Sequence, residues 1–121
     1  MDSKQLATII ATELEQKQGN DVMVLEVSHL TSITDYFVIA GGQSSIKVRA
    51  LAEAVEEKLE KEGIQVRRKE GVQASRWIVL DYISVIVHIF HDEERQFYNI
   101  ERLWMDGGNL TDFMPKGEDN G

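Results

Sequence analysis

Two short apolar segments, residues 22–27 and 35–40, constrain the fold of this chain more than any other feature. Both are rich in apolar, β-branched or aromatic residues, which is typical of strands that are covered on both faces. Such strands need helices to cover them, and amphipathic helical patterns occur at 2–18 and between Ser45 and Gly63. The combination predicts the α/β class.

The remaining segments complete the expected order of elements. Residues 64–69, 77–81 and 84–90 have the alternation or the apolar composition of strands, and the last two are close enough to form a hairpin. Residues 92–104 follow as a helix with Asp92 as its expected N-cap. This order predicts a mixed sheet of about five strands in a single layer, with helices packed against it.

The length of the chain, 121 residues, favours one hydrophobic core and therefore a single domain. We expect this domain to span residues 1–106. From residue 107 onward the composition shifts to glycine, proline and a short polar run. That shift indicates a flexible C-terminal tail over residues 107–121.

Charge and cysteine content exclude several classes of function. The 21 acidic residues outnumber the 13 basic ones, and a formal net charge of -8 argues against binding to DNA and against extensive direct contact with RNA. The absence of cysteine excludes disulfides, zinc–thiolate sites and cysteine nucleophiles. Neither a signal peptide nor an apolar run long enough for a bilayer is present, so we expect a cytoplasmic protein with no membrane partner.

The turn Gly41-Gly42-Gln43-Ser44-Ser45 lies where a strand is expected to enter a helix, a position at which backbone amides can bind phosphate. It matches neither the dinucleotide fingerprint nor the P-loop, so a serine N-cap is the favoured interpretation. A nucleotidyltransferase begins with a similar turn but needs two aspartates on the next strand to bind magnesium. No aspartate occurs between Asp35 and Asp81, which argues against two-metal phosphoryl transfer.

The segment His88-Ile89-Phe90-His91-Asp92 contains residue types that bind metals. Residues three apart on a strand point to opposite faces, however, so His88 and His91 are not expected to share one ion. A half-buried strand position is the favoured interpretation of His88. Since no serine elbow motif is present either, the sequence predicts neither a cofactor nor a catalytic site.

Aromatic residues gather in the last third of the chain. Core packing is the expected role of Phe90 and Phe97. Two tryptophans and two tyrosines among acidic residues also fit a protein-binding patch with an acidic rim, and core and interface are equally favoured for Trp77 and Trp104. The candidate contact residues are Trp77, Asp81, Tyr82, His88, Glu94, Tyr98, Glu101 and Trp104.

Strand alternation adds a detail to this patch. One face of the first hairpin strand carries Trp77, Val79 and Asp81, and one face of the second carries Ile86, His88 and Phe90. The alternation does not tell whether these two faces coincide.

Several motifs, taken together and in order, resemble the ribosomal silencing factor (Iojap-like) family. The first is the run 31–40 followed by 42–45, and the second comprises Glu70-Gly71, residues 77–82, residues 85–90 and residues 98–104. The resemblance extends from the first helix to Trp104. Each block alone is weak, but their order and spacing are specific.

The resemblance implies an α/β domain related to the nucleotidyltransferase fold but without its catalytic carboxylates, and therefore no enzymatic activity. It also implies a cytosolic translational repressor that binds the large ribosomal subunit through ribosomal protein L fourteen and blocks subunit joining in starvation. Homodimers are implied as well. On the matching motifs we expect Trp77 and Trp104 as anchors, with further contacts from Asp81, Glu94, Glu101, Tyr82, His88 and Tyr98.

Two departures from the family pattern concern details of the surface. Ile83-Ser84 replaces the usual Gly-Asp, and because Ile83 is β-branched it should resist the positive φ that glycine accepts in a tight hairpin. Lys47 replaces a frequent histidine. Two alternative functions remain open, namely a divergent nucleotidyltransferase and a simple homodimerisation module.

Overall fold

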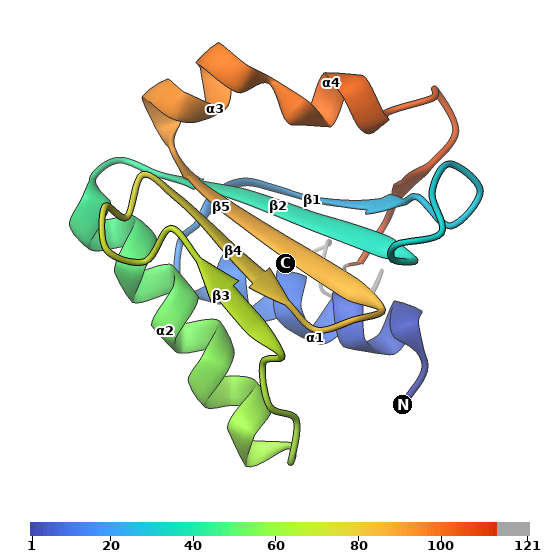
Figure 1. The fold of residues 1–121 in the computed structure, drawn as a ribbon, viewed down its shortest axis with the longest axis horizontal. Coiled ribbons are helices and arrows are strands. Elements are labelled where there is room, and N and C mark those ends of the chain that lie inside the picture. Colours follow the sequence, from blue (N-terminus) through green and yellow to red (C-terminus); the bar gives the residue numbers. More distant parts are fainter. Residues whose placement is uncertain (114–121) are drawn as a thin grey trace, which may run out of the picture.

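The computed structural model describes residues 1–113, in which a six-stranded mixed sheet lies between two unequal layers of helix (Figure 1). The elements in chain order are α1 (Ser3–Gln16), β1 (Asn20–Glu26), β2 (Tyr36–Gly42), α2 (Ser45–Lys61), β3 (Arg68–Glu70), β4 (Trp77–Asp81), β5 (Val85–His91), α3 (Asp92–Tyr98), α4 (Ile100–Trp104) and β6 (Leu110–Thr111). The strand order is β3-β4-β5-β2-β1-β6, with β2 and β5 parallel and the other pairs antiparallel. The predicted α/β domain with a mixed sheet is confirmed, with six strands instead of about five.

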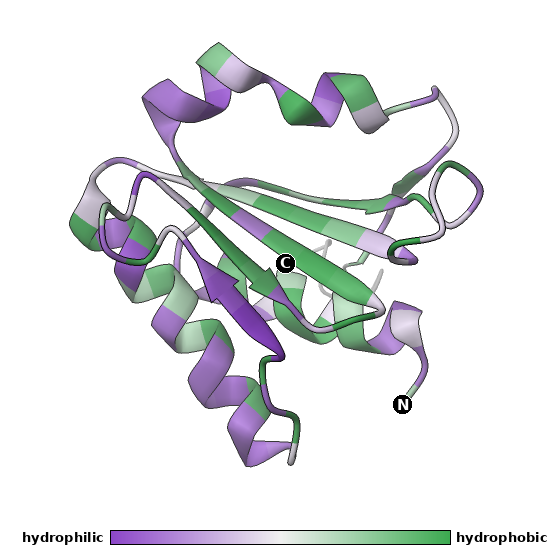
Figure 2. Ribbon diagram, viewed as in Figure 1, coloured by the Kyte–Doolittle hydropathy of each residue, from purple (hydrophilic) through white to green (hydrophobic). Residues whose placement is uncertain are grey.

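The two helical layers cover the sheet to different extents. Helices α1 and α2 pack on one face, where they form the larger hydrophobic cluster with the sheet. Helices α3 and α4 arch over the other face, whose cluster consists of Leu25, Val27, Phe37, Ile39 and Phe90. All seven residues of β2 are buried, as expected for a strand covered on both faces. Figure 2 shows hydrophobic residues along β2 and hydrophilic residues along β3.

Local sequence signals begin the two long helices. The Asp2 carboxylate accepts a hydrogen bond from the backbone N–H of Gln5 at 2.7 Å, and the Gln5 side chain accepts one from the Asp2 N–H at 2.9 Å. This capping box satisfies two of the free amides at the start of α1. Ser44 caps α2, since its hydroxyl accepts from the Lys47 N–H at 3.1 Å. The predicted serine N-cap is confirmed.

The predicted strand at 64–69 is shorter and lies later than expected. Only Arg68–Glu70 forms a strand, paired with the segment Val79–Asp81 of β4. The residues before Arg68 have no partner strand because β4 ends at Asp81, and Ile64 and Val66 pack against the core instead.

Residues 92–104 form two helices in place of the single predicted helix. Asn99 adopts a left-handed conformation with φ 50°, ends α3 and begins α4. Asparagine accepts this conformation more readily than most residues. His91, and not Asp92, is the N-cap of α3, because its Nδ1 accepts a hydrogen bond from the Glu93 N–H.

The two phenylalanines expected in the core have different environments. Phe90 is fully buried, as predicted. Phe97 is 80% exposed on α3, and the prediction that it is a core residue is wrong. Helix α3 buries Arg95 instead, and Phe97 lies on its exposed face.

The segment expected to be a flexible tail begins inside the fold. Leu110 and Thr111 form β6, which pairs with β1, and Asn109 is only 5% exposed. This order depends on hydrogen bonds of the Asn109 side chain, which a composition shift toward glycine does not reveal. Residues 114–121 of the predicted tail lie outside the described residues. In the described part, no helix combines the length and the apolar character needed to cross a membrane.

Candidate partner-binding groove

The pairing of β4 with β5 brings the predicted hairpin faces together. Trp77 lies opposite Phe90, Val79 opposite His88, and Asp81 opposite Ile86. Paired residues of an antiparallel ladder point to the same face, so these six side chains belong to one surface. That surface is the one beneath α3 and α4.

A groove of about 270 Å³ opens in this surface, where α3 and α4 leave the sheet uncovered. Its lining combines an apolar floor, a charged edge strand, a loop and the end of α4. The lining residues are Thr31, Ile33, Phe37, Arg68, Glu70, Val79, Asp81, Ile86, His88 and Trp104. We call this surface the β5 groove.

Ring contacts join the predicted aromatic residues beside the β5 groove. Phe37 packs edge-on against both His88 and Trp104, with ring centroids 5.0 Å apart in each pair. Trp77 stacks on Phe90 at 4.7 Å and contacts Tyr98 at 5.1 Å. Both tryptophans are half-buried, so each combines a packing contact with an accessible edge. Such residues are common at the centre of protein interfaces.

His88 is bonded through one ring nitrogen only. The Trp77 Nε1–H donates to His88 Nδ1 at 3.1 Å, while Nε2 has no hydrogen-bond partner among residues 1–113. Burial lowers the pKa of His88 from 6.5 to about 4, because the charged imidazolium is poorly solvated there. The half-buried strand position predicted for His88 is confirmed, and its ring is neutral near pH 7.

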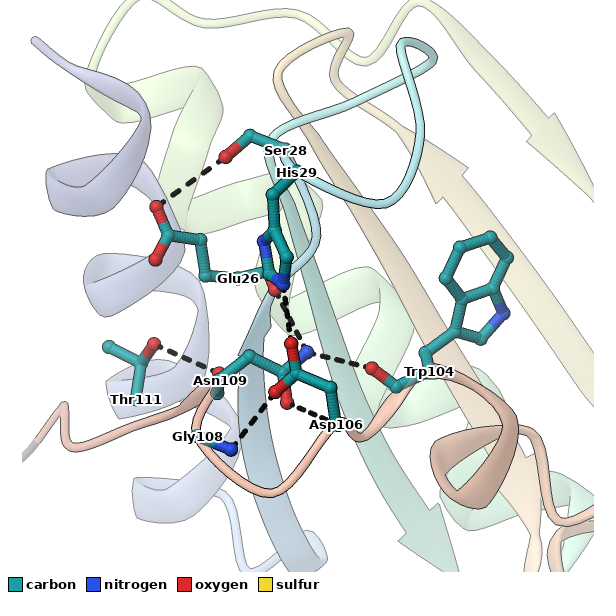
Figure 3. A network of polar contacts seen from close by, with 8 residues as sticks. All are labelled: Glu26, Ser28, His29, Trp104, Asp106, Gly108, Asn109 and Thr111. Atoms are coloured by element: carbon teal, nitrogen blue, oxygen red, sulfur yellow. Dashed lines mark hydrogen bonds and ion pairs between the residues drawn. The ribbon is translucent and has the colours of Figure 1, made fainter.

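A polar network positions Trp104 at the wall of the groove (Figure 3). The Asn109 side-chain amide donates to the backbone carbonyls of Trp104 at 2.7 Å and of Glu26 at 2.9 Å. Asn109 Oδ1 in turn accepts from the Asp106 N–H at 2.9 Å. One buried amide therefore fixes the end of α4 to β1.

The same network links the loop that precedes β2 to the turn after α4. His29 Nε2 lies 2.5 Å from a carboxylate oxygen of Asp106 (Figure 3). The hydrogen bond from His29 and a backbone bond from Gly108 lower the pKa of Asp106. Thr31 and Ile33 of this loop line the groove opposite Trp104, so the contact joins two of its walls.

Two of the three predicted acidic contacts already have partners. Glu94 pairs with Arg76 at 2.8 Å. Glu101 pairs with Arg95 at 3.0 Å, and these two side chains are only 19% and 9% exposed. Asp81 lines the groove, and its Oδ1 accepts from the Ile83 N–H at 2.8 Å. Among residues 1–113, Asp81 is the one predicted acid without an ion pair.

Tyr82 does not share the surface of the other candidate residues. It is 6% exposed and belongs to the large cluster on the α1 and α2 face. Burial and the nearby charges of Glu56 and Glu60 raise the pKa of its phenol. Strand alternation accounts for the difference, because Tyr82 follows Asp81 and points the opposite way.

Ile83, which replaces the family's usual glycine, lies in the turn between β4 and β5. Ile83 adopts φ 74°, the left-handed region that a β-branched residue was expected to resist, and its side chain is 60% exposed. The hydrogen bond to Asp81 holds this conformation. The turn therefore keeps a glycine-like backbone without a glycine.

The side chains of the described region do not form a metal centre. No group of three histidine, cysteine, aspartate or glutamate residues within 1–113 is arranged to bind a metal ion. His91 caps α3, and the Ser44 hydroxyl caps α2. The paired aspartates that phosphoryl transfer requires do not occur on β3, which carries Arg68, Lys69 and Glu70.

Several groove residues escaped the sequence-based prediction. Ile33 is 73% exposed within a polar stretch, and an isolated apolar residue in such a stretch was the available signal. Arg68 and Glu70 enter the groove because β3 is the edge next to β4. No sequence signal distinguishes that placement from other strand orders.

Comparisons with known proteins identify the family. The family model described as "Ribosomal silencing factor during starvation" matches residues 1–120. The ribosomal silencing factor of Bacillus subtilis is 36% identical over 106 residues, which cover 88% of this chain and 90% of that protein. A mouse protein named "Mitochondrial assembly of ribosomal large subunit protein 1" is 28% identical over 99 residues, covering 79% of this chain and 43% of the mouse protein.

A solved structure shows the same fold. The crystal structure of a Chromobacterium violaceum protein superposes with a TM-score of 0.84 at 32% identity, and the match covers 95% of this chain and 94% of that one. The sequence motifs, the fold without a metal-binding carboxylate group in its described part, and these matches agree. The chain belongs to the ribosomal silencing factor family, whose members are ribosome-binding regulators and not enzymes.

Proposed function

We propose that this protein represses translation in starvation by binding the large ribosomal subunit and sterically blocking its union with the small subunit. The match of the family model to nearly the whole chain carries this proposal. The name of the mouse relative also refers to the large ribosomal subunit. No bond is made or broken in this mechanism, because occupying the joining surface is sufficient.

The β5 groove is the proposed contact surface. It offers an apolar floor, and Ile33 of its lining is 73% exposed. Exposed apolar residues around a concave surface are typical of interaction sites. Trp104 lies at the wall of the groove and Trp77 lies behind His88, so both tryptophans support this surface.

Charge favours a protein component of the subunit as the partner. A chain with a net charge of -8 is repelled by ribosomal RNA, whereas a basic ribosomal protein complements it. The family resemblance implies ribosomal protein L fourteen as that component, and we propose it here. Asp81 is the acidic groove residue placed to pair with a basic side chain.

Sedimentation of purified subunits tests the proposal. An excess of the protein should prevent joined ribosomes from forming, and it should comigrate with the large subunit only. An Ile33→Asp variant should need about tenfold more protein, because it places a charge on the apolar rim. Ile46→Asp is the matched control, since Ile46 is 84% exposed on α2, away from the groove. Undiminished joining at excess wild-type protein would refute the proposal.

A direct binding assay with isolated ribosomal protein L fourteen tests the partner. Binding that is lost in Ile33→Asp and kept in Ile46→Asp supports this protein as the docking site. Binding to the large subunit without binding to the isolated ribosomal protein would place the contact elsewhere on the subunit. The proposed role takes place in the cytoplasm of a bacterial cell.

A homodimer is also proposed, through the same exposed apolar rim. The area that a ribosomal partner would cover is then the area that a second copy covers. Light scattering over a dilution series should show dimers that Ile33→Asp weakens and Ile46→Asp preserves. Competition between dimerisation and large-subunit binding should follow.

A further inference from the structure

The hydrogen bond between Trp77 and His88 determines where the imidazole proton lies. An indole nitrogen only donates, so the His88 Nδ1 that accepts its N–H at 3.1 Å carries no proton. A neutral imidazole must then carry its proton on Nε2. Protonating Nδ1 as well would place two N–H groups against each other and break the bond.

The Nε2–H of His88 lacks an acceptor. Within the described residues this atom makes no hydrogen bond, and solvent scarcely reaches it. A buried unsatisfied donor is destabilising, and native structures rarely keep one without a reason. The same ring lines the β5 groove, where a partner is proposed to bind.

Resting on the proposed function, we infer that Trp77 is a positioning residue that holds His88 as the Nε2–H tautomer. We infer further that this N–H donates to a backbone carbonyl oxygen of the ribosomal protein seated in the β5 groove. His88 is then a specificity-determining contact, and Trp77 acts through it. The partner completes a hydrogen bond that the free protein leaves open.

The charged groups around the groove favour a neutral oxygen over a phosphate. Arg68 and Glu70 both line the groove, and their charges compensate each other because the guanidinium is bonded to the carboxylate at 2.8 Å and 3.1 Å. Asp81 therefore remains as the uncompensated charge of the lining, and it would repel an anion. Tyr98, from α3, contacts Trp77 and adds no charge near pH 7. A carbonyl oxygen avoids this repulsion.

Access to the donor requires a small rearrangement. Because solvent does not reach Nε2 in the free protein, a partner oxygen reaches it only when a lining side chain shifts. Trp104 is the candidate, since its half-buried ring packs on Phe37, which contacts the His88 ring, and α4 contains no buried residue. The new hydrogen bond then satisfies a donor that has no partner among residues 1–113 of the free protein.

Two substitutions of His88 test the donor. His88→Gln keeps an N–H close to the Nε2 position, and we expect its affinity for purified large subunits to stay within about threefold of wild type. His88→Leu keeps the volume without a donor, and we expect about tenfold weaker binding, as for one lost hydrogen bond. Equal affinities of His88→Leu and wild type, with both proteins folded, would overturn the donor.

The tautomer is tested on the free protein, without ribosomes. Nitrogen NMR of labelled histidine should show His88 neutral and protonated on Nε2. Trp77→Phe keeps an aromatic ring but removes the N–H, so the two neutral tautomers of His88 should mix, while its pKa, which burial lowers, should stay well below 6.5. Trp104→Phe is the control, because the Trp104 indole makes no contact with the His88 ring among those described.

The outcomes separate this inference from the proposed function. Failure of the wild type to bind large subunits defeats the proposed function and the donor together, while NMR still decides the tautomer. If the wild type and His88→Leu bind large subunits equally well, the inferred hydrogen bond is refuted and the proposed function is not. Wild-type binding that competes with short RNA and is lost on adding salt, with His88→Leu unaffected, would indicate a phosphate contact instead.

Discussion

The two faces of the sheet bury very different amounts of hydrophobic surface. Under α1 and α2, one continuous cluster joins both helices to four strands, whereas under α3 and α4 the buried cluster of the described region contains only five residues. The second face instead carries the β5 groove, an unsatisfied His88 Nε2–H and exposed apolar side chains. The difference indicates that one face stabilises the domain and leaves the other available for a partner.

The largest expected difference between the two faces is the stability lost when a buried side chain is truncated. Leu80 is fully buried on the α1 and α2 face, and Leu80→Ala should reduce the free energy of unfolding by about 2–5 kcal/mol. Ile86 is half-buried in the groove, and Ile86→Ala should cost about 1 kcal/mol because the site is already partly open. Urea denaturation measures both. Equal losses would mean that the two faces contribute equally.

The pH dependence of stability should come in part from the groove face. The pKa of His88 is about 4 in the folded chain and near 6.5 when unfolded. Between these values the unfolded chain binds a proton that the folded chain does not, so this contribution is complete above pH 6.5 and is lost as the pH falls toward 4. It amounts to up to about 3 kcal/mol.

His88→Gln isolates that contribution, since other groups titrate in both proteins. Urea unfolding of wild type and variant at pH 7 and at pH 4.5 should show a larger loss in the wild type. Parallel losses would show that His88 is as well solvated when folded as when unfolded.

The stability of the face under α3 and α4 should depend on the Asn109 side chain, which joins the end of α4 to β1. Asn109→Ala removes the hydrogen bonds to the carbonyls of Trp104 and Glu26, and should cost about 1–3 kcal/mol. Thr111→Val is the matched control, because the Thr111 hydroxyl makes only a 3.4 Å contact to the Asn109 carbonyl. Thermal unfolding compares the two. An unaffected Trp104 fluorescence in Asn109→Ala would argue that Asn109 does not hold the end of α4 in place.

The smallest expected effect is a gain in stability from a substitution in the turn between β4 and β5. Ile83 has φ 74° and is 60% exposed, so Ile83→Gly should relieve backbone strain and stabilise the domain by about 1 kcal/mol. Ser84→Gly should not stabilise it, since Ser84 has no positive φ among the described residues. A destabilised Ile83→Gly would show that the side chain contributes more by packing than the strain costs.

Local patterns were sufficient for most of the fold. Residue composition and periodicity identified the long helices, the serine cap of α2, and the buried central strand β2. They overlooked the break at Asn99, which depends on the left-handed backbone of one residue, and strand β6, which depends on pairing with the distant β1. The sequence alone does not show that the Asn109 side chain will donate hydrogen bonds to the carbonyls of Trp104 and Glu26.

The candidate site was predictable by residue type and less so by placement. His88, Trp104 and Asp81 line one groove, but that fact required the register of β4 on β5 and the strand order. Glu94 and Glu101 have the charge of rim residues, yet Arg76 and Arg95 pair with them. Arg76 and Glu94 lie 18 residues apart, and Arg95 and Glu101 belong to two different helices, so no local period reports these pairings.

The parallel pairing of β2 with β5 has a consequence for synthesis of the protein. Tyr36 pairs with Val85, and α2, β3 and β4 lie between them in the chain. A nascent chain therefore cannot close its central ladder until β5 has left the ribosomal tunnel, and non-local pairings of this kind form slowly. Strand β6, which is made last, pairs with β1, which is made first. We expect a protein of this family to complete its fold only after most of its own chain has been translated.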